Sequence, residues 1–476
     1  MSEVAGEGPR LAERYDAVVI GAGPGGYVCA IRLAQHGRKT LLVERERAGG
    51  VCLNWGCIPV KALLHAASVV RHAAEMRAAG IVFGAPQVDL LTLYSWKGRV
   101  VDRLVRGVEF LLRNNGVETV KGSAAMAGPG RVSIKLDDGS ATTVQAGAVV
   151  IATGSKPTVL AGLEPDGQRI IDSNGALNLF EKPERLAIVG AGVIGLEFAT
   201  IFSRLGTKVT VLELLPQVLP GTEPDIAAQV QRLMQREGVE FRLGVKVLGA
   251  EPNAVIKLKY ADAQGEQSVE ADKVLVAVGR VPLSAGLDLE SAGVETDARG
   301  FVKTNAKLQA AGRTVYAIGD VRGGPLLAHK AMVEGIAAAD TIAGVRAPRR
   351  FTAIPAVVYT DPEVATVGLT ETEAAAQGRA VKVSRVPLTA VGRSLTLGRS
   401  EGFARLVVDA ATDKVLGMQM VGPQADVLIA EATLAVELGL KAADIGRVVH
   451  PHPTMSELVF EAAEAIHGKA VHVVNR

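Results

Sequence analysis

Two glycine-rich segments with the same spacing constrain the fold of this chain more than any other feature. In the first, Gly21, Gly23 and Gly26 form a G-x-G-x-x-G motif after the apolar run "YDAVVI", and Glu44 lies 18 residues after the last glycine. This pattern is typical of a strand, a tight turn, a helix and a second strand. The glycines let a pyrophosphate approach the helix N-terminus, and the acid binds ribose hydroxyls.

The same pattern recurs in the middle of the chain. Gly190, Gly192, Gly195 and Glu213 repeat it within "RLAIVGAGVIGLEFATIFSRLGTKVTVLE", and the acid again lies 18 residues after the last glycine. A single motif can be a structural turn, but two with the same helix length indicate two dinucleotide sites. No Arg or Lys occurs in the "LLPQ" that follows Glu213, so a 2′-phosphate would meet only a carboxylate. The second site is therefore expected to prefer NAD over NADP.

The length and composition predict a soluble protein of several domains. At 476 residues the chain suggests about three domains. A net charge of +2 gives no reason to expect nucleic acid or an anionic membrane as a partner. Every apolar run as long as a membrane span contains a charge. The first fourteen residues have the character of neither a signal nor a transit peptide, so we expect a short arm on a cytoplasmic protein.

Two of the three cysteines, Cys52 and Cys57, lie five positions apart in "GGVCLNWGCIPVKALL". Zinc would need further Cys or His ligands that the neighbouring sequence does not supply, so we predict no metal. Cys29, on the first predicted helix, is interpreted as a buried hydrophobic residue. The glycines around the pair allow the two sulfurs to meet, and the helix that follows would stabilise a thiolate. Dithiol and disulfide could then interconvert there.

With Lys61 four residues after Cys57, the segment reads C-x-x-x-x-C-x-x-x-K beside a glycine motif. In this it resembles the pyridine nucleotide-disulfide oxidoreductases, and among them the dihydrolipoamide dehydrogenases. The similarity runs from about Tyr15 to the end of the chain. Val60 departs from it, since the dehydrogenases usually carry serine there, and we expect altered helix capping or disulfide tuning without loss of the chemistry. Further segments carry the resemblance: "IATGS", "VAVGR", "VYAIGD", "GGPLLAHKA", "VVYTDPEVATVGLTE" and "HPHPTMSE".

The resemblance implies which residues bind the cofactors. The first glycine motif and Glu44 would hold the ADP half of FAD, and Asp320 would accept hydrogen bonds from the ribityl hydroxyls. A helix beginning near Leu327 would point its positive end at the flavin. The second glycine motif and Glu213 would bind NAD. The remaining cofactor-binding residues implied in this way are Lys61, Thr153, Gly154 and Gly279.

The resemblance also implies the roles of the redox residues. Cys57 would lie against the flavin, and Cys52 would face the substrate as the thiol that exchanges with it. Lys61 would pair with Glu197, which follows the second glycine motif, beside the reactive edge of the flavin.

Thiol exchange needs a base, because a free cysteine is only slightly ionised at neutral pH. His452 lies between two prolines in "HPHPTMSE", and Glu457 follows five residues later, where it could hold the imidazole. His450 is interpreted as structural. The resemblance implies that His452 and Glu457 serve the cysteines of the other subunit, so that the active enzyme is a homodimer.

These motifs predict an order of domains. We expect an FAD-binding domain at 1–155, an NAD-binding domain at 156–281, a return to the FAD-binding domain at 282–350 and an interface domain at 351–476. The fold class is α/β, with two doubly wound, Rossmann-like units that bind ligands at the carboxyl ends of their strands. The C-terminal dimerisation domain is expected to be α+β, with an antiparallel sheet that carries helices on one face.

The activity that the resemblance implies is oxidation of protein-bound dihydrolipoamide by NAD⁺ through a redox-active disulfide and FAD. The partner would be the lipoyl domain and the peripheral-subunit-binding region of an acyltransferase in a 2-oxoacid dehydrogenase complex, or a glycine-cleavage carrier protein. An NADH-dependent reductase of another small disulfide is the enzymatic alternative. A flavoprotein scaffold without activity is an alternative of another class; it predicts loss of at least one catalytic residue, and all are present.

Overall fold

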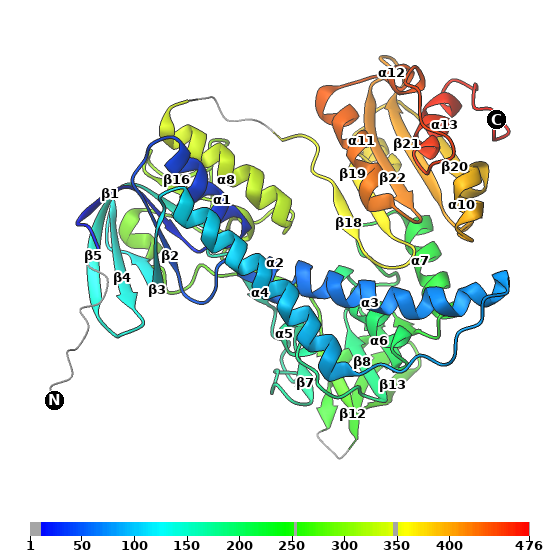
Figure 1. Cartoon of the computed structure of the whole chain (residues 1–476), viewed down its shortest axis with the longest axis horizontal. Coiled ribbons are helices and arrows are strands. Elements are labelled where there is room, and N and C mark those ends of the chain that lie inside the picture. Colours follow the sequence, from blue (N-terminus) through cyan, green and yellow to red (C-terminus); the bar gives the residue numbers. More distant parts are fainter. Residues whose placement is uncertain (1–10, 252–254, 346–350, 476) are drawn as a thin grey trace.

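The computed structural model describes residues 11–251, 255–345 and 351–475, which form three units (Figure 1). The first unit lies at the left of the view, the second at the lower right, and the third, which is C-terminal, at the upper right. Most of the predicted N-terminal arm falls outside the described residues. Its described end, Leu11 and Ala12, packs on the first unit.

The first unit is a seven-stranded sheet with parallel strands at its centre. β1 lies between β2 and β5, with Val18 opposite Leu41 on one side and Val149 on the other. Strands buried on both faces are apolar along most of their length, which is why these segments were recognisable in the sequence. The strands are β1 (Arg14–Ile20), β2 (Thr40–Glu44), β3 (Glu118–Met126), β4 (Arg131–Leu136), β5 (Ala141–Ile151), β16 (Gln309–Ala311) and β17 (Val315–Ala317).

Helices cover one face of this sheet and strands cover the other. Val19, Val150 and Tyr316 pack against α1, α4 and α8. On the opposite face, the ends of β3 and β5 join β4 in an antiparallel layer over Val18 and Val149. The Rossmann-like unit is confirmed, whereas the helices expected on its second face are replaced by strands. The helical segments of this unit are α1 (Pro24–Gln35), α4 (Leu90–Asn114), η2 (Leu289–Ala292), η3 (Gly319–Arg322) and α8 (Ala328–Ala343).

The second unit repeats this plan with a fully parallel sheet in the order β10-β9-β8-β14-β7. Leu186 and Ile188 of β8 pack with α6 and α7, while Ala187 and Val189 face the separate antiparallel sheet β11-β12-β13. The alternation of buried and more exposed residues along β12 is typical of a sheet with one solvent-exposed face. The elements are β7 (Ile170–Ile171), α5 (Ser173–Ala176), β8 (Arg185–Val189), α6 (Val193–Arg204), β9 (Lys208–Glu213), α7 (Pro224–Arg236), β10 (Glu240–Leu243), β11 (Lys246–Glu251), β12 (Ile256–Asp262), β13 (Gly265–Ala271) and β14 (Lys273–Val276).

The third unit is an antiparallel sheet in the order β18-β19-β22-β21-β20. Leu406 and Met418 pack under α11, α12 and α13, while Phe403 and Val421 face the second unit. The expected α+β domain with helices on one face is therefore confirmed. Its elements are β18 (Ala356–Val358), β19 (Val364–Gly368), α9 (Glu371–Ala376), β20 (Val381–Pro387), η4 (Leu388–Ala390), α10 (Gly392–Thr396), β21 (Phe403–Asp409), β22 (Val415–Val421), α11 (Ala425–Leu438), α12 (Ala442–Gly446) and α13 (Glu457–Ala465).

The chain leaves the first sheet through β6 (Ser155–Pro157) and returns to it through β15 (Arg280–Pro282), and these two strands pair with each other. The domain boundaries at 155 and 281 stay predictions, and the boundary at 350 falls outside the described residues.

Two helices in series link the three units. α2 (Gly50–Trp55) and α3 (Cys57–Glu75), followed by η1 (Met76–Ala79), run from the first unit into the space between the second and third (Figure 1). Among the described residues, Gly50–Ala79 is the one helical stretch long and apolar enough to cross a membrane by length and composition. It carries Cys57 and Lys61 and packs on α4 and α6, as a core helix does.

Candidate active site

A cavity of about 1640 Å³ opens where the carboxyl ends of the two parallel sheets meet. β1, β2, β8 and β9 all end at its wall, which is where open α/β sheets bind ligands. Most of the residues expected to bind cofactors or carry the redox chemistry line it. They are Gly21, Gly23, Glu44, Cys52, Cys57, Lys61, Thr153, Gly154, Gly190, Gly192, Glu197, Glu213, Gly279 and Asp320.

The first glycine motif forms a turn that only glycine fits. Gly21 has φ +101°, and a Cβ there would lie 2.5 Å from the carbonyl oxygen of Ala152. A Cβ at Gly26 would lie 1.8 Å from the carbonyl oxygen of Gly21, which explains why α1 can start so close to the strand. At Gly23, by contrast, no described residue other than its two chain neighbours comes within 4 Å of that position. This glycine opens on the cavity and is the N-cap of α1, to which no described side chain gives a capping bond.

The second glycine motif has the same geometry. A Cβ at Gly190 would lie 2.5 Å from the carbonyl oxygen of Ala277, and one at Gly195 would lie 2.0 Å from that of Gly190. Gly192 again opens on the cavity and caps α6 without a side-chain bond from any described residue. Uncapped N–H groups at two helix starts that open on one cavity fit two pyrophosphates.

The two acids at the strand ends hold these turns. Glu44 Oε2 accepts a hydrogen bond from the backbone N–H of Ala22 at 2.6 Å, and Glu213 Oε2 accepts one from Ala191 at 2.7 Å. Each carboxylate therefore lies against the middle of its own glycine motif. The donors and acids at both places fit the dinucleotides FAD and NAD.

Asp320 is held by two residues that the sequence analysis did not single out. Ser155 Oγ donates to Asp320 Oδ2 at 2.5 Å, and Arg280 Nε donates to Ser155 Oγ at 2.8 Å. Arg280 also donates to the Ser155 carbonyl oxygen at 2.7 Å, so it ties β15 to β6. Both residues lie within the quoted segments "IATGS" and "VAVGR", but no local spacing relates them to Asp320.

The helix expected near Leu327 begins there, because Leu327 is the N-cap of α8 and lines the cavity. Glu334 of this helix accepts from the backbone N–H of Gly319 at 2.8 Å and so holds the loop that carries Asp320. The uncapped start of α8 fits an acceptor of negative charge.

The two cysteines lie at the junction of α2 and α3. Cys57 is the first residue of α3, and both sulfurs are free thiols. A hydrogen bond from Cys52 lowers the pKa of Cys57 to about 7, because it outweighs burial and is reinforced by Lys61. The same hydrogen bond, together with burial, raises the pKa of Cys52. The pair therefore has one thiol that ionises near neutral pH, as a thiol that passes on electrons requires.

Lys61 and Glu197 form the ion pair that the resemblance implied. Lys61 Nζ lies 2.8 Å and 2.9 Å from the two carboxylate oxygens of Glu197. Tyr359 adds two contacts: its backbone N–H donates to Glu197 Oε1 at 3.2 Å, and its ring centre lies 4.5 Å from Lys61 Nζ. Three segments far apart in the sequence thus meet beside Cys57.

Replacing Lys61 with methionine is expected to raise the pKa of Cys57 above 7, because the ammonium that favours the thiolate is lost. Alkylation of Cys57 at neutral pH should then slow, and the midpoint of its pH profile should move upward. The measurement is the rate of iodoacetamide labelling against pH, by peptide mass spectrometry. Tyr359→Phe, which keeps the ring and the backbone N–H, is the control; an unchanged midpoint in Lys61→Met would contradict the assignment.

The histidine pair lies apart from the cavity. His452 Nδ1 lies 2.8 Å from Glu457 Oε1, as the spacing predicted, but neither residue belongs to the described lining of the cavity. The His452 side chain is 76% exposed, and α13, which begins at Glu457, is well separated from α2 (Figure 1). Within one chain the structure therefore brings together Cys52, Cys57, Lys61 and Glu197, and leaves His452 pointing outward.

Three further residues that the sequence analysis discussed, His450, Cys29 and Val60, have side chains that are largely buried. The His450 side chain is only 7% exposed, its Nε2 lies 3.0 Å from Glu431 Oε1, and its ring packs at a tilt against Phe460, which fits its structural interpretation. Cys29 is fully buried, and burial raises its pKa to about 12, as expected of an inert thiol. Val60 is buried in the apolar cluster around α6, while Gly56 occupies the N-cap position of α3.

Two family models match this chain over most of its length. Residues 15–335 match the family described as pyridine nucleotide-disulphide oxidoreductase, and residues 354–463 match the dimerisation domain of the same family. The chain is 47% identical over 466 residues to a dihydrolipoyl dehydrogenase of Thermus scotoductus, and this alignment covers 97% of this chain and 99% of the relative. It is 45% identical to dihydrolipoyl dehydrogenase 3 of Pseudomonas aeruginosa, over 97% of this chain and all (100%) of the relative.

Solved structures share the fold at lower identity. LpdA from Mycobacterium tuberculosis superposes with a TM-score of 0.88 at 26% identity, over 95% of this chain and 99% of that one. The HOCl-induced flavoprotein disulfide reductase RclA from Escherichia coli superposes with a TM-score of 0.83 at 27% identity, over 94% and 99% of the two chains.

Proposed function

The chain belongs to the pyridine nucleotide-disulphide oxidoreductase family, and on that premise we propose that it oxidises a protein-bound dihydrolipoyl group with NAD⁺ as acceptor. One observation carries the proposal. A dithiol with one easily ionised sulfur, flanked by the Lys61–Glu197 pair, opens on a cavity whose lining includes residues of both glycine motifs. The family implies FAD and NAD(H) for these motifs, and a flavoprotein scaffold without activity would have no use for such a dithiol.

The relatives support the choice of substrate. Several curated relatives at 42–47% identity over nearly the whole chain are dihydrolipoyl dehydrogenases. The disulfide reductase RclA is only 27% identical, so reduction of another small disulfide by NADH is the less supported alternative.

In the proposed reaction the oxidised enzyme holds a Cys52–Cys57 disulfide. A substrate thiolate attacks the Cys52 sulfur, which forms a mixed disulfide and releases Cys57 as a thiolate that Lys61 stabilises. The second substrate thiol then attacks the substrate sulfur bound to Cys52, which closes the lipoyl disulfide and frees Cys52. His452, held by Glu457, takes the proton of the attacking thiol, and the oxidised substrate leaves with two electrons fewer.

The cofactor-binding residues complete the cycle. Bound FAD would supply the two-electron acceptor that reoxidises the enzyme dithiol and would pass a hydride to NAD⁺. Gly23, Glu44 and Asp320 would hold FAD, and the start of α8 would favour negative charge on it. Gly192 and Glu213 would hold NAD⁺, and the Glu213 carboxylate would repel a 2′-phosphate.

The proposal also includes a homodimer, a partner protein and a location in the cell. The chain carries the dimerisation domain of its family, and His452 points outward, which supports a homodimer in which it reaches the cysteines of a second subunit. We further propose a lipoyl-bearing acyltransferase or a glycine-cleavage carrier protein as the partner. The division at 155, 281 and 350 and a cytoplasmic location are likewise proposals, the latter because a reducing compartment suits an exchangeable cysteine pair.

The proposal predicts fast NADH formation when the purified holoenzyme is mixed anaerobically with dihydrolipoamide and NAD⁺. The measurement is NADH absorbance, with Cys52→Ser as the matched control and NADP⁺ as the second acceptor. We expect the variant to be inactive and NADP⁺ to be used at least about tenfold less efficiently than NAD⁺. A flavin that NADH reduces, together with no turnover of dihydrolipoamide, would contradict the substrate and favour another disulfide.

A further inference from the structure

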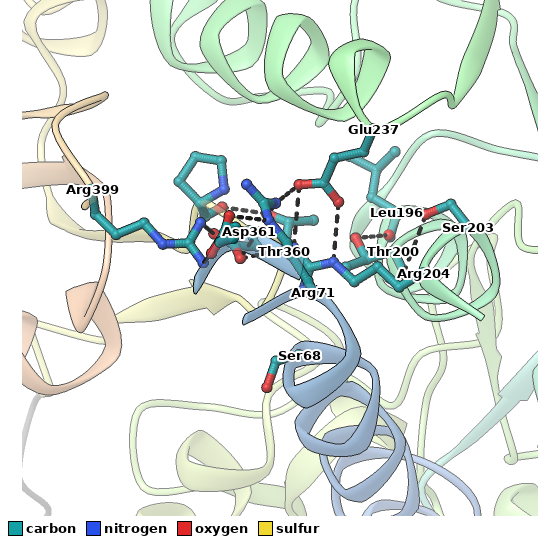
Figure 2. Close-up of polar contacts among 12 residues, drawn as sticks. Ser68, Arg71, Leu196, Thr200, Ser203, Arg204, Glu237, Thr360, Asp361 and Arg399 are labelled. Carbon is teal, nitrogen blue, oxygen red and sulfur yellow. Dashed lines mark hydrogen bonds and ion pairs between the residues drawn. The ribbon is translucent and has the colours of Figure 1, made fainter. Parts of the chain in front are cut away.

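A second cluster of charges lies where α3 meets the second and third units, and none of its members belongs to the described lining of the cavity (Figure 2). It contains three arginines and three carboxylates, which we name the ionic junction. Its members are Arg71, Glu75, Arg204, Glu237, Asp361 and Arg399.

Asp361 is the member that contacts all three arginines. Its Oδ2 lies 2.7 Å from Arg204 Nη2 and 3.5 Å from Arg71 Nη1, and its Oδ1 lies 3.4 Å from Arg399 Nη1. These arginines come from α6, from α3 and from the segment between α10 and β21. A single carboxylate of the third unit therefore joins the linking helix α3, the second unit and another segment of the third unit.

The other two acids close the network. Glu237 pairs with Arg204 at 3.0 Å and also contacts Arg71, while Glu75 accepts from Arg71 at 2.7 Å and from Arg399 at 3.0 Å. The charges balance, and Arg204 is only 6% exposed. Removal of one carboxylate would leave buried guanidinium groups without a counter-charge, so the surrounding segments would have to move.

Three of the segments that meet at the ionic junction also meet at the active site, namely α3, α6 and the segment 359–361. Lys61 precedes Arg71 by ten residues on α3, and Glu197 precedes Arg204 by seven residues, two helical turns, on α6. Tyr359, whose backbone N–H donates to Glu197, precedes Asp361 by two residues. α3, α6 and this segment are thus joined at two levels about 10–15 Å apart along the helices, once beside Cys57 and once at the ionic junction.

We propose that Asp361 is a positioning residue, which fixes α3, α6 and the Tyr359 segment against one another and so keeps Lys61 and Glu197 in place beside Cys57. Packed helices transmit such a constraint because their contacts have few alternative arrangements. The inference rests on the proposed function where turnover is concerned, but its effect on Cys57 does not depend on the substrate.

Asp361 is charged at neutral pH, as this role requires. Burial opposes its ionisation, but Arg204, Arg399 and Arg71 outweigh burial and lower its pKa. Asp361→Asn keeps the shape and removes the charge. We expect the junction to loosen and Lys61 to lose its fixed place between Glu197 and Tyr359.

The test compares Asp361→Asn with Asp225→Asn in a Cys52→Ser holoenzyme, where Cys57 is the thiol left at the site. Asp225, in the first turn of α7, accepts from Arg405 of β21 at 3.2 Å. It therefore also joins the second unit to the third through an arginine, but it touches neither α3 nor the Tyr359 segment in the described contacts. The measurement is the pH profile of Cys57 alkylation, with unfolding temperatures recorded for both variants.

In Asp361→Asn we expect alkylation of Cys57 at neutral pH to slow roughly three- to tenfold and the midpoint to rise, by less than in Lys61→Met. The direction follows because Lys61 affects the Cys57 pKa more than Glu197 does. Asp225→Asn should leave the profile unchanged. Restoring Cys52, Asp361→Asn should lower kcat for dihydrolipoamide with little change in KM.

Equal profiles for the two variants, or an unchanged midpoint in Asp361→Asn, would overturn the proposal and reduce the junction to a stabilising cluster. If Asp361→Asn does not fold, Arg399→Met removes one arm of the junction and takes its place; it must move the midpoint in the same direction by a smaller amount. Because alkylation needs no substrate, failure of the dihydrolipoyl assignment would leave this result standing.

Discussion

Replacing Cys57 with serine is expected to abolish NADH formation from dihydrolipoamide, by more than about a thousandfold in kcat/KM. A serine at this position cannot form the disulfide that the substrate attacks, nor can it return an electron pair. The effect should be this large because no other thiol can substitute: the chain has three cysteines, and Cys29 is fully buried. The measurement is the initial rate of NADH absorbance under anaerobic conditions.

Cys29→Ala is the matched control, because it also removes one thiol from the chain but touches neither sulfur of the pair. We expect it to keep near-normal turnover and to lose some stability, since a small cavity replaces a buried sulfur. Comparable loss of activity in the two variants would show that the effect of Cys57→Ser is structural and not chemical.

The second large effect is expected at His452. His452→Gln should lower kcat for dihydrolipoamide oxidation by about 10²- to 10⁴-fold, the usual contribution of a positioned base. The control is His472→Gln, because His472 is another exposed histidine, 62% exposed, whose Nδ1 lies 2.6 Å from the carboxylate of Glu461. The comparison thus separates a general effect of losing a histidine–glutamate pair from loss of the base. Steady-state rates for both variants decide between them.

Mixed dimers of the same variants determine which subunit supplies the base. A dimer of one Cys52→Ser subunit and one His452→Gln subunit has one intact site only if the histidine acts across the interface. We therefore expect activity to return when the two inactive variants are unfolded and refolded together. Continued inactivity of verified mixed dimers would show that His452 serves the cysteines of its own chain, or none.

The parts of the site that depend on local sequence were the most predictable. Both glycine motifs fold into the expected turns, because the crowding at Gly26 and Gly195 comes from the carbonyl oxygens of Gly21 and Gly190, which belong to the same motif. The pairing of His452 with Glu457 also depends on a short spacing. Lys61 and Glu197 are 136 residues apart, and only the family resemblance related them before the structure placed them together.

Contacts between units were not predictable in the same way. Arg280, Ser155 and Asp320 form one hydrogen-bonded chain, yet they lie on three separate segments with no common period. The six residues of the ionic junction are equally scattered, and charged residues on amphipathic helices usually face solvent. The antiparallel layers over both parallel sheets were also not predicted. Alternation of apolar and polar residues indicates a half-exposed strand, but it does not indicate which surface that strand covers.

The carboxylate of Glu213 has a consequence for anyone who wishes to redesign the coenzyme preference of this enzyme. It accepts hydrogen bonds from the backbone N–H groups of Ala191, in the second glycine motif, and Leu215, which follows β9. It therefore also stabilises the backbone of these two loops. A charge reversal to arginine would remove the repulsion that we propose for a phosphorylated ribose and, in the same step, leave two amides without an acceptor. Redesign at this position should begin with short neutral acceptors such as serine or asparagine, with the new cation introduced from a neighbouring strand.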